Sequence, residues 1–188
     1  MAVKVACGIL QQEIAVTDPF PDPHRVPDAA ALAQARAILE TARDAVLSVL
    51  DPEGWPMVSR IALQADAEGR PLAMLSDLAL HTAALRADRR AALLLDAPAE
   101  EPGRGMPLTR ARLSLQVEAC PVSPAEDEAL RRAWVAHDPK AAVYARLGDF
   151  RLWRMLPRGG LLNAGFGRAY RLTAADLSFG GHDERPGD

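Results

Sequence analysis

The stretch from Pro71 to Asp96, PLAMLSDLALHTAALRADRRAALLLD, constrains the fold most, because its hydrophobic period changes twice within a short distance. The apolar runs Pro71–Leu75 and Ala91–Leu95 are typical of buried strands. Between them, from Leu78 to Leu85, apolar residues recur at helical spacing, and a charged segment follows. The stretch therefore predicts a strand, a helix of one or two turns and a second strand in immediate succession.

Four small or polar residues lie at the corner between that first strand and the helix: Ser76, Asp77, His81 and Thr82. Hydroxyls, an imidazole and the unpaired amides of a helix start are groups that bind a phosphate ester. The local chemistry by itself favours a structural interpretation, in which Asp77 caps the helix and Ser76 ends the strand. Both interpretations of this corner stay open at this point.

The segments before this stretch predict further strands joined by tight turns. Ala45–Leu50 and Trp55–Leu63 are strand-like, and the DPEG sequence at 51–54 places proline at the second position of a turn. The ADAEGR sequence at 65–70 predicts the next hairpin. Strands with such short connections predict an antiparallel meander that can close into a barrel.

Two helices are expected outside the strands. Asp28 is a good cap for a helix whose apolar residues run from Ala31 to Ala42 at three- and four-residue spacing. The sequence Ser123–Glu126 combines a hydroxyl cap, a proline at the first helical position and a glutamate that completes a capping box. This second helix should extend to about Ala136, with a shorter helix after it.

The second half of the chain also contains strand patterns. In Arg110–Glu118, apolar and polar residues alternate, which predicts a strand with one wholly polar face. Two late strands are expected over Asp149–Leu156 and Leu161–Ala164, and the sequence between them, at 157–160, predicts a turn.

Five ordered segments resemble those of the pyridoxamine 5'-phosphate oxidase-like FMN-binding split barrels. The most specific is SDLALHTAAL at 76–85, preceded by GRPLAML and followed by RADRRAALLL. GWPMVSRIAL at 54–63 resembles the preceding strand pair and PLTRARLSLQ at 107–116 the following one. AHDPKAAVYARLGDFRLWRM and NAGFGRAYRL resemble the distal part, so the segments cover roughly 29–177. The His-Thr pair at 81–82 is most similar to the haem-utilisation branch.

The resemblance and the strand succession predict the same fold class. We expect a mainly β protein with peripheral helices (α+β), built on an antiparallel FMN-binding split β-barrel. The barrel domain is expected over residues 28–179. An N-terminal arm with a proline-rich linker would precede it at 1–27, and a polar tail would follow it at 180–188.

An FMN site is what the resemblance implies for these residues. The cofactor's dianionic phosphate requires a guanidinium and hydroxyl donors. By resemblance, the second strand supplies part of the phosphate site, the helix corner supplies further donors, and the 107–116 segment lines the flavin cleft. The cofactor-binding residues expected on this basis are Ser59, Arg60, Ser76, His81, Thr82, Arg110 and Arg112.

Two of these residues have other possible roles. Arg60 lies inside an apolar strand, where a charge needs a partner, so it could instead form an ion pair with Asp or Glu of a neighbouring strand. His81 has an alternative role as a haem or metal ligand. The four histidines form neither an i, i+4 pair nor a cluster with cysteine, so no metal site is expected.

Composition and missing motifs exclude several classes. A net charge of −3 provides no field that would attract nucleic acid or an acidic membrane. No G-x-S-x-G, G-x-G-x-x-G or Walker sequence is present, and no catalytic residue is assigned. No apolar run is long enough to span a membrane, and no convincing signal-peptide cleavage segment follows the first residues, so a cytoplasmic protein is expected.

The predicted function is that of an FMN-dependent oxidoreductase. Hydride or electron transfer would occur at the flavin ring, and a small-molecule substrate would enter a cleft between the two subunits of a homodimer. By resemblance, the strand at 112–118 lines both that interface and the cleft. The alternatives are a non-catalytic haem- or flavin-binding protein of the haem-utilisation type, and a split-barrel dimer without a cofactor.

Overall fold

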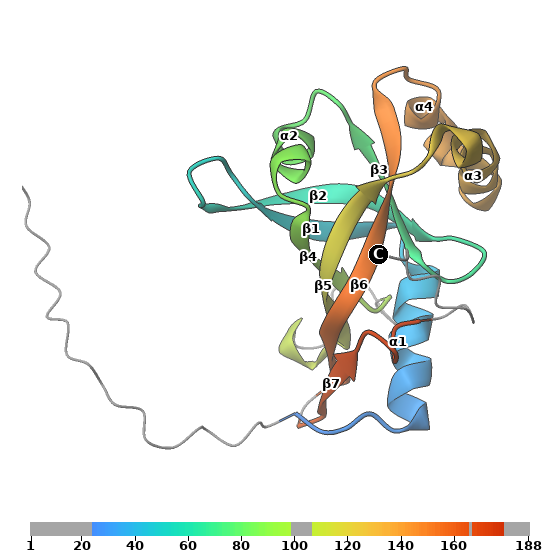
Figure 1. The fold of residues 1–188 in the computed structure, drawn as a ribbon. Coiled ribbons are helices and arrows are strands. Elements are labelled where there is room, and N and C mark those ends of the chain that lie inside the picture. The colour runs from blue at the N-terminus through green and yellow to red at the C-terminus, as the bar shows by residue number, and fades with distance from the viewer. Residues whose placement is uncertain (1–23, 99–106, 166, 179–188) are drawn as a thin grey trace, which may run out of the picture.

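The computed structural model describes residues 24–98, 107–165 and 167–178. One seven-stranded sheet, in the order β3-β2-β1-β4-β5-β6-β7, forms its centre (Figure 1). The strands are β1 (Asp44–Leu50), β2 (Pro56–Ala65), β3 (Pro71–Ser76), β4 (Arg90–Asp96), β5 (Arg112–Pro121), β6 (Phe150–Asn163) and β7 (Ala169–Thr173). The helices are α1 (Ala29–Thr41), α2 (Leu80–Ala87), α3 (Pro124–His137) and α4 (Ala142–Ala145), with short 3-10 turns η1 (Pro107–Thr109) and η2 (Pro139–Ala141).

Strands β1 to β6 close into a barrel because β3 pairs with β6 as well as with β2. All pairings between the named strands are antiparallel. The predicted antiparallel barrel with peripheral helices is therefore confirmed. Strand β7, which the sequence patterns did not predict, extends the sheet beyond the barrel by pairing with the second half of β6.

One predicted connection is wrong. Residues 157–160 were expected to form a turn, but β6 runs unbroken through them. A register shift at Gln116/Val117 places Val117 opposite Pro157 and Gln116 opposite Gly159, which leaves Arg158 as the extra residue of a β-bulge. Gly160 is required because a Cβ atom there would lie 2.5 Å from the Ser114 carbonyl oxygen. Proline and glycine thus mark a bulge and a close backbone approach instead of a turn.

The core fills the barrel with inward-facing residues that alternate along the strands. Leu47, Leu63, Leu93 and Leu115 are at most 1% exposed. Helix α1 contributes its buried face to the same core. This helix begins as predicted, because the backbone N–H of Ala31 donates to Asp28 Oδ1 at 2.7 Å.

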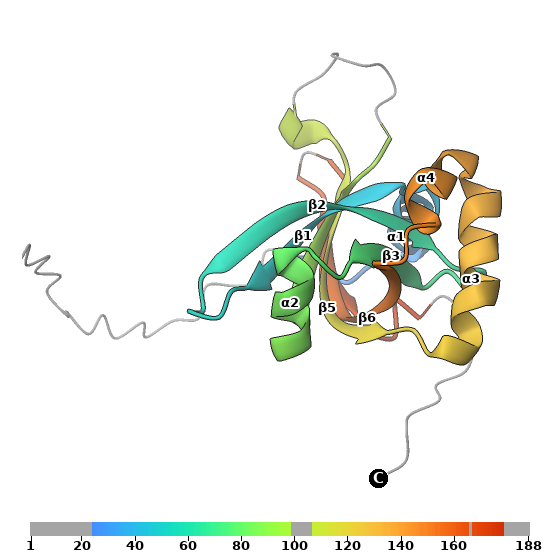
Figure 2. The same ribbon diagram turned by 90° about the horizontal axis from the view of Figure 1, so that it is seen from above.

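A second, smaller core lies between α3, α4 and the sheet, and includes Trp134, Ala145 and Leu152. Figures 1 and 2 show α2 on one side of strands β3 and β6, with α3 and α4 on the other. Helix α3 begins after Ser123 as predicted, although the Ser123 hydroxyl donates to Glu126 Oε2 at 2.7 Å and makes no bond to the backbone at the helix start.

The domain boundaries stay predictions. The predicted arm lies mostly, and the predicted tail entirely, outside the described residues. In the part of the chain that the structure describes, no helix is long and apolar enough to cross a membrane.

Candidate functional site

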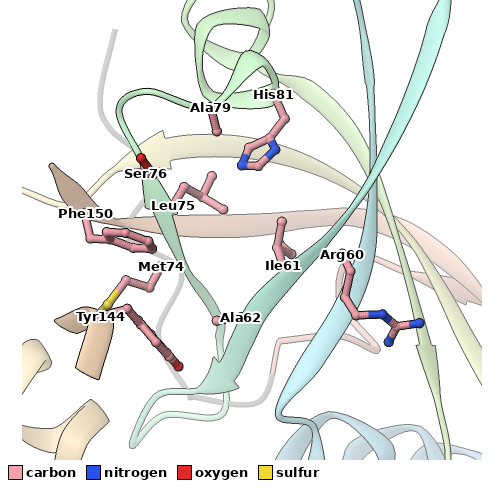
Figure 3. Close-up of a pocket in the computed structure, with 10 residues that line it drawn as sticks. All are labelled: Arg60, Ile61, Ala62, Met74, Leu75, Ser76, Ala79, His81, Tyr144 and Phe150. Carbon is pink, nitrogen blue, oxygen red and sulfur yellow. The ribbon is translucent and has the colours of Figure 1, made fainter. Parts of the chain in front are cut away.

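A pocket of about 250 Å³ opens between the start of α2 and the helix α4 (Figure 3). Ten residues from β2, β3, α2, α4 and β6, or next to these elements, line it. Seven of them are apolar or aromatic, and the three others are Arg60, Ser76 and His81. Three residues that the sequence analysis selected thus lie around one pocket, within walls that are mainly apolar.

The pairing of β3 with β6 gives the pocket an aromatic wall. Ser76 lies opposite Phe150 in the register of these strands, so the end of β3 and the start of β6 are adjacent. The ring of Phe150 packs against Tyr144 of α4 with 5.7 Å between the ring centroids and 36° between their planes. In Figure 3 these two rings lie on one side of the pocket and Arg60 on the other, with the His81 imidazole directed between them.

His81 is the polar group best placed to bind a ligand in this pocket. Its imidazole is half-buried, and burial lowers the pKa of His81 from its ordinary value of 6.5. No hydrogen-bond partner for this ring occurs among the described residues. A neutral imidazole without a partner has a nitrogen lone pair available for a metal or for a donor group of a ligand.

Ser76 already makes two hydrogen bonds. Its hydroxyl donates to Asp149 Oδ2 at 2.5 Å and accepts the backbone N–H of Leu78 at 3.1 Å. A phosphate at this hydroxyl would compete with a carboxylate and would experience its negative charge. Ser76 ends β3, as the structural interpretation of the corner predicted.

The proposed helix cap by Asp77 is wrong. Helix α2 begins after Ala79, which provides no side-chain cap, and the side chain of Leu78 is 84% exposed ahead of the helix. Asp77 instead forms ion pairs with Arg86 at 2.5 Å and with Arg151 of β6 at 3.4 Å. The nearby arginines attract this carboxylate away from the start of the helix.

Arg60 lies on the outer face of β2, and its guanidinium pairs with Asp44 of the neighbouring strand β1. This ion pair is the structural alternative that the sequence left open. The Arg60 side chain is 71% exposed, and in Figure 3 it extends away from Ser76 and His81. The guanidinium can therefore reorient toward a ligand at the pocket edge without leaving a buried charge unpaired.

The other four predicted residues do not line the pocket. Ser59 is paired with buried Leu47, on the opposite face of β2 from Arg60. Thr82 is completely buried, and its hydroxyl has no hydrogen-bond partner in the described part of the chain. Arg110 precedes β5 and Arg112 begins it, and Arg112 Nη1 donates to the Leu108 carbonyl oxygen at 3.3 Å.

The sequence analysis gave no role to the residues that form the aromatic side of the site. Tyr144 and Phe150 line the pocket, and both come from a segment more than sixty residues after His81. Asp149, which accepts from Ser76, belongs to the same segment. Only the β3–β6 pairing brings this segment to the pocket, and no local pattern encodes that pairing. The resemblance of this segment to the distal part of the barrel family was the single available signal.

An exposed apolar patch lies next to the pocket on the outer face of the barrel. Arg60 is in register with Val46 of β1, which is in register with Leu94 of β4, and the row continues through β5 to Leu161 of β6. Leu94 and Leu161 are 38% and 36% exposed, and Val58, two residues before Arg60, is 67% exposed. We call Val58, Leu94 and Leu161 the outer patch. Ser114 separates Leu94 from Leu161 in this row, so the outer patch is a set of exposed apolar side chains spread along one face of the sheet.

The residues around the pocket offer groups that could hold a haem or the phosphate of FMN. Within the described ranges, no group of three His, Cys, Asp or Glu residues could hold a free metal ion. A haem requires apolar faces, an iron ligand and a cation for its carboxylates, and the pocket offers apolar walls, His81 and Arg60. A phosphate requires free donors; the Ser76 hydroxyl is engaged by Asp149, and Arg60 would have to leave Asp44 for a phosphate as it would for a haem carboxylate.

Three known proteins are similar to this chain over more than half of its length. One solved structure has 52% sequence identity to this chain and superposes on it with a TM-score of 0.75. The aligned region covers 81% of this chain and 98% of the chain in that structure. The solved haem-binding protein from Mycobacterium smegmatis is 28% identical, with a TM-score of 0.71 over 81% of this chain and 62% of that one. The non-canonical haem oxygenase HOZ, chloroplastic, of Arabidopsis thaliana is 34% identical over 106 residues, which are 56% of this chain and 31% of that protein.

This chain thus spans about a third of the length of its curated relative and under two thirds of the mycobacterial one. The family model described as pyridoxamine 5'-phosphate oxidase matches residues 31–162, which include strands β1 to β5 and nearly all of β6. The chain belongs to the pyridoxamine 5'-phosphate oxidase family.

Proposed function

We propose that this protein binds haem in the pocket beside α2. The observation that carries the proposal is the half-buried imidazole of His81 inside a mainly apolar pocket, where no described residue hydrogen-bonds to the ring. Two relatives above 25% identity, the mycobacterial haem-binding protein and the plant haem oxygenase, support it. This is the non-catalytic alternative that the sequence analysis set beside the flavoenzyme.

Each polar residue of the pocket has a separate role in this proposal. His81 would hold the iron through a ring nitrogen, and burial lowers the pKa of His81, which favours the neutral ring that such a ligand requires. Arg60 exchanges Asp44 for a haem carboxylate at the open edge. The aromatic wall of Tyr144 and Phe150 excludes water from one face. Bound haem would supply a redox-active iron, while the chain supplies orientation and shelter.

A homodimer is part of the same proposal. Small-molecule sites usually enclose about 300–1,000 Å³, whereas this pocket has about 250 Å³ and is open at one side. One subunit would therefore cover only part of a macrocycle. The outer patch borders the pocket along the Arg60 row, so a second copy docked there would cover the remainder. No nucleic acid or membrane has a role in this arrangement.

The second candidate is an FMN-dependent oxidoreductase that acts on a small molecule. Family membership and the shared position of Arg60, Ser76 and His81 around one pocket favour it. For this function, Arg60 would have to leave Asp44, and Ser76 would have to turn from Asp149 to the phosphate. The flavin would supply the hydride or electron chemistry, and the chain would orient it.

Parallel titrations of the cofactor-free full chain with haemin and with FMN distinguish the candidates. Haem binding predicts a saturable Soret shift that is lost in His81→Ala and kept in His137→Ala, a histidine exposed at the end of α3. Saturable quenching of FMN fluorescence without a haemin shift would favour the second candidate. A haemin spectrum that is identical for wild type and His81→Ala would contradict the role of His81.

A further inference from the structure

We propose that Arg131 of α3 is a positioning residue that fixes the aromatic wall of the pocket from behind. It does not line the pocket itself. Its guanidinium donates hydrogen bonds to the backbone of Ala145, which follows Tyr144, and to the backbone of Phe150. These bonds set the position of Tyr144 relative to Phe150. The inference rests on the proposed function in one respect, that a ligand uses this wall.

The hydrogen bonds of Arg131 connect three elements. Nη1 donates to the carbonyl oxygen of Ala145 at 2.8 Å, and Ala145 directly follows Tyr144. Nη2 donates to the carbonyl oxygen of Phe150 at 3.0 Å. The guanidinium also contacts Asp127, one turn earlier in α3, through Nε at 3.1 Å and Nη2 at 3.2 Å. A rigid planar group with five donors can make all these bonds at once, whereas an ammonium cannot.

Burial makes this arrangement specific. The Arg131 side chain is 21% exposed, and Asp127 is 32% exposed. The carbonyl of Ala145 belongs to the last turn of α4, where carbonyl groups lack partners within the helix. Arg131 supplies a charged donor to this helix end, which is also the favourable position for a cation.

The wall has further attachments. The backbone N–H of Leu147 donates to the Tyr144 carbonyl oxygen at 3.0 Å, and the backbone N–H of Phe150 donates to the Leu147 carbonyl oxygen at 3.3 Å. Trp134 Nε1 donates to the Tyr144 hydroxyl at 3.4 Å, and Asp149 accepts from Ser76 at 2.5 Å. Leu147 links the two aromatic residues within their own segment, whereas Arg131 links both of them to a separate helix, α3. Arg131 therefore fixes the segment that carries both rings against the rest of the molecule.

Arg132, the next residue, provides a matched control. It pairs with Glu128 at the same i, i+4 spacing at which Arg131 pairs with Asp127. Its side chain is 68% exposed, however, and in the described part of the chain it donates to no carbonyl of the wall. Both arginines lie on α3, so a general effect of removing a guanidinium from this helix would appear in both variants.

The first test compares Arg131→Lys with Arg132→Lys, using whichever of haemin and FMN the wild-type full chain binds. We expect the dissociation constant to rise roughly tenfold for Arg131→Lys, equivalent to about 1.4 kcal/mol, and to stay unchanged for Arg132→Lys. When Phe150→Ala is present, adding Arg131→Lys should cause little further loss, because one of the two rings whose relative position Arg131 sets is already absent. Additive losses would overturn the inference.

The second test needs no ligand. Hydrogen exchange of the cofactor-free protein should speed up over residues 142–150 in Arg131→Lys, with exchange in α1 unchanged. Unchanged exchange over 142–150, or an equal increase everywhere, would overturn the positioning role. If wild type binds neither haemin nor FMN, the proposed function fails, and this exchange measurement still decides the role of Arg131. Arg131→Lys is used in both tests because it retains a cation at this position, whereas Arg131→Ala could fail to fold.

Discussion

Two arginine–aspartate pairs, both attached to strand β2 or the turn after it, have very different surroundings. In the middle of β2, Arg60 pairs with Asp44 across the outer face, and the two side chains are 71% and 54% exposed. Directly after β2, Asp66 pairs with Arg154 of β6 at 2.8 Å, and the side chains of Arg154 and Asp66 are 14% and 1% exposed. The exposed arginine can therefore exchange its aspartate for another anion, whereas the buried pair must stay together for the fold to be stable. The reason is that water stabilises separated charges only where it can reach them.

The buried pair belongs to a network that closes the β2–β3 hairpin. Asp66 accepts the backbone N–H groups of Glu68 and Arg70 at 3.1 and 2.8 Å, and it also pairs with Arg70 Nε at 2.9 Å. Arg154 continues to Glu126 of α3 at 2.6 Å. Glu126 has a lowered pKa because Ser123 and then Arg154 donate to it. This network connects the barrel to the helix that carries Arg131.

The largest expected effect is that of Asp66→Ala. The change leaves two arginines without their shared buried partner and removes the acceptor of two turn amides. We expect the free energy of unfolding to fall by about 3–5 kcal/mol. Urea denaturation measures it, with Glu68→Ala as the control, since Glu68 is 54% exposed and its loss should cost about 0–1 kcal/mol. Similar losses for the two variants would remove the distinction between the pairs.

Arg154→Met should have a smaller effect than Asp66→Ala. Methionine fills much of the same space, and Asp66 keeps Arg70 and both turn amides as partners. Hydrogen bonds to charged groups are worth about 1.5–3 kcal/mol, so we expect a loss of stability of about that size. A parallel urea titration measures it. Stability equal to or above that of wild type would show that the buried pair provides no net stabilisation, as happens for some buried pairs.

Arg60→Ala should affect ligand binding more than stability. We expect the free energy of unfolding to change by at most about 1 kcal/mol, because the pair with Asp44 is exposed. The affinity for haemin or FMN should fall by very roughly one to two decades, since an anionic group loses its charge-assisted bonds. Arg60→Lys should recover only part of this loss. Unchanged affinity would return Arg60 to a purely structural role.

Asp44→Asn is the smallest and sharpest of these changes. It frees Arg60 while it preserves the size of the partner side chain, so stability should fall by less than about 1 kcal/mol. The affinity for an anionic ligand should rise, because Asp44 no longer competes for the guanidinium. A few-fold gain, about 0.5–1 kcal/mol, is expected in the same titrations. A loss of affinity would mean that Asp44 positions Arg60 for the ligand.

Local signals in the sequence determined most of the helices and strands. The Asp28 cap, the strand–helix–strand succession at 71–96 and the buried side of α2 all occur in the structure, because capping and hydrophobic spacing act between neighbours in the chain. The alternation in 110–118 likewise produced β5 with Leu113 and Leu115 inside. The ordered segments also identified the barrel family, although no pattern within them separated haem from FMN.

Only the tertiary structure decided which residues from distant parts of the chain contact one another. The sequence could not show that Asp77 would pair with Arg151, that residues 157–160 would pass through a bulge, or that Phe150 would lie beside Ser76. Each outcome depends on the register between strands far apart in the chain, and strand register is set by how the whole barrel closes. The pocket follows from the same closure: its polar residues come from a short stretch of β2, β3 and α2, but its aromatic wall exists only because β6 returns to pair with β3.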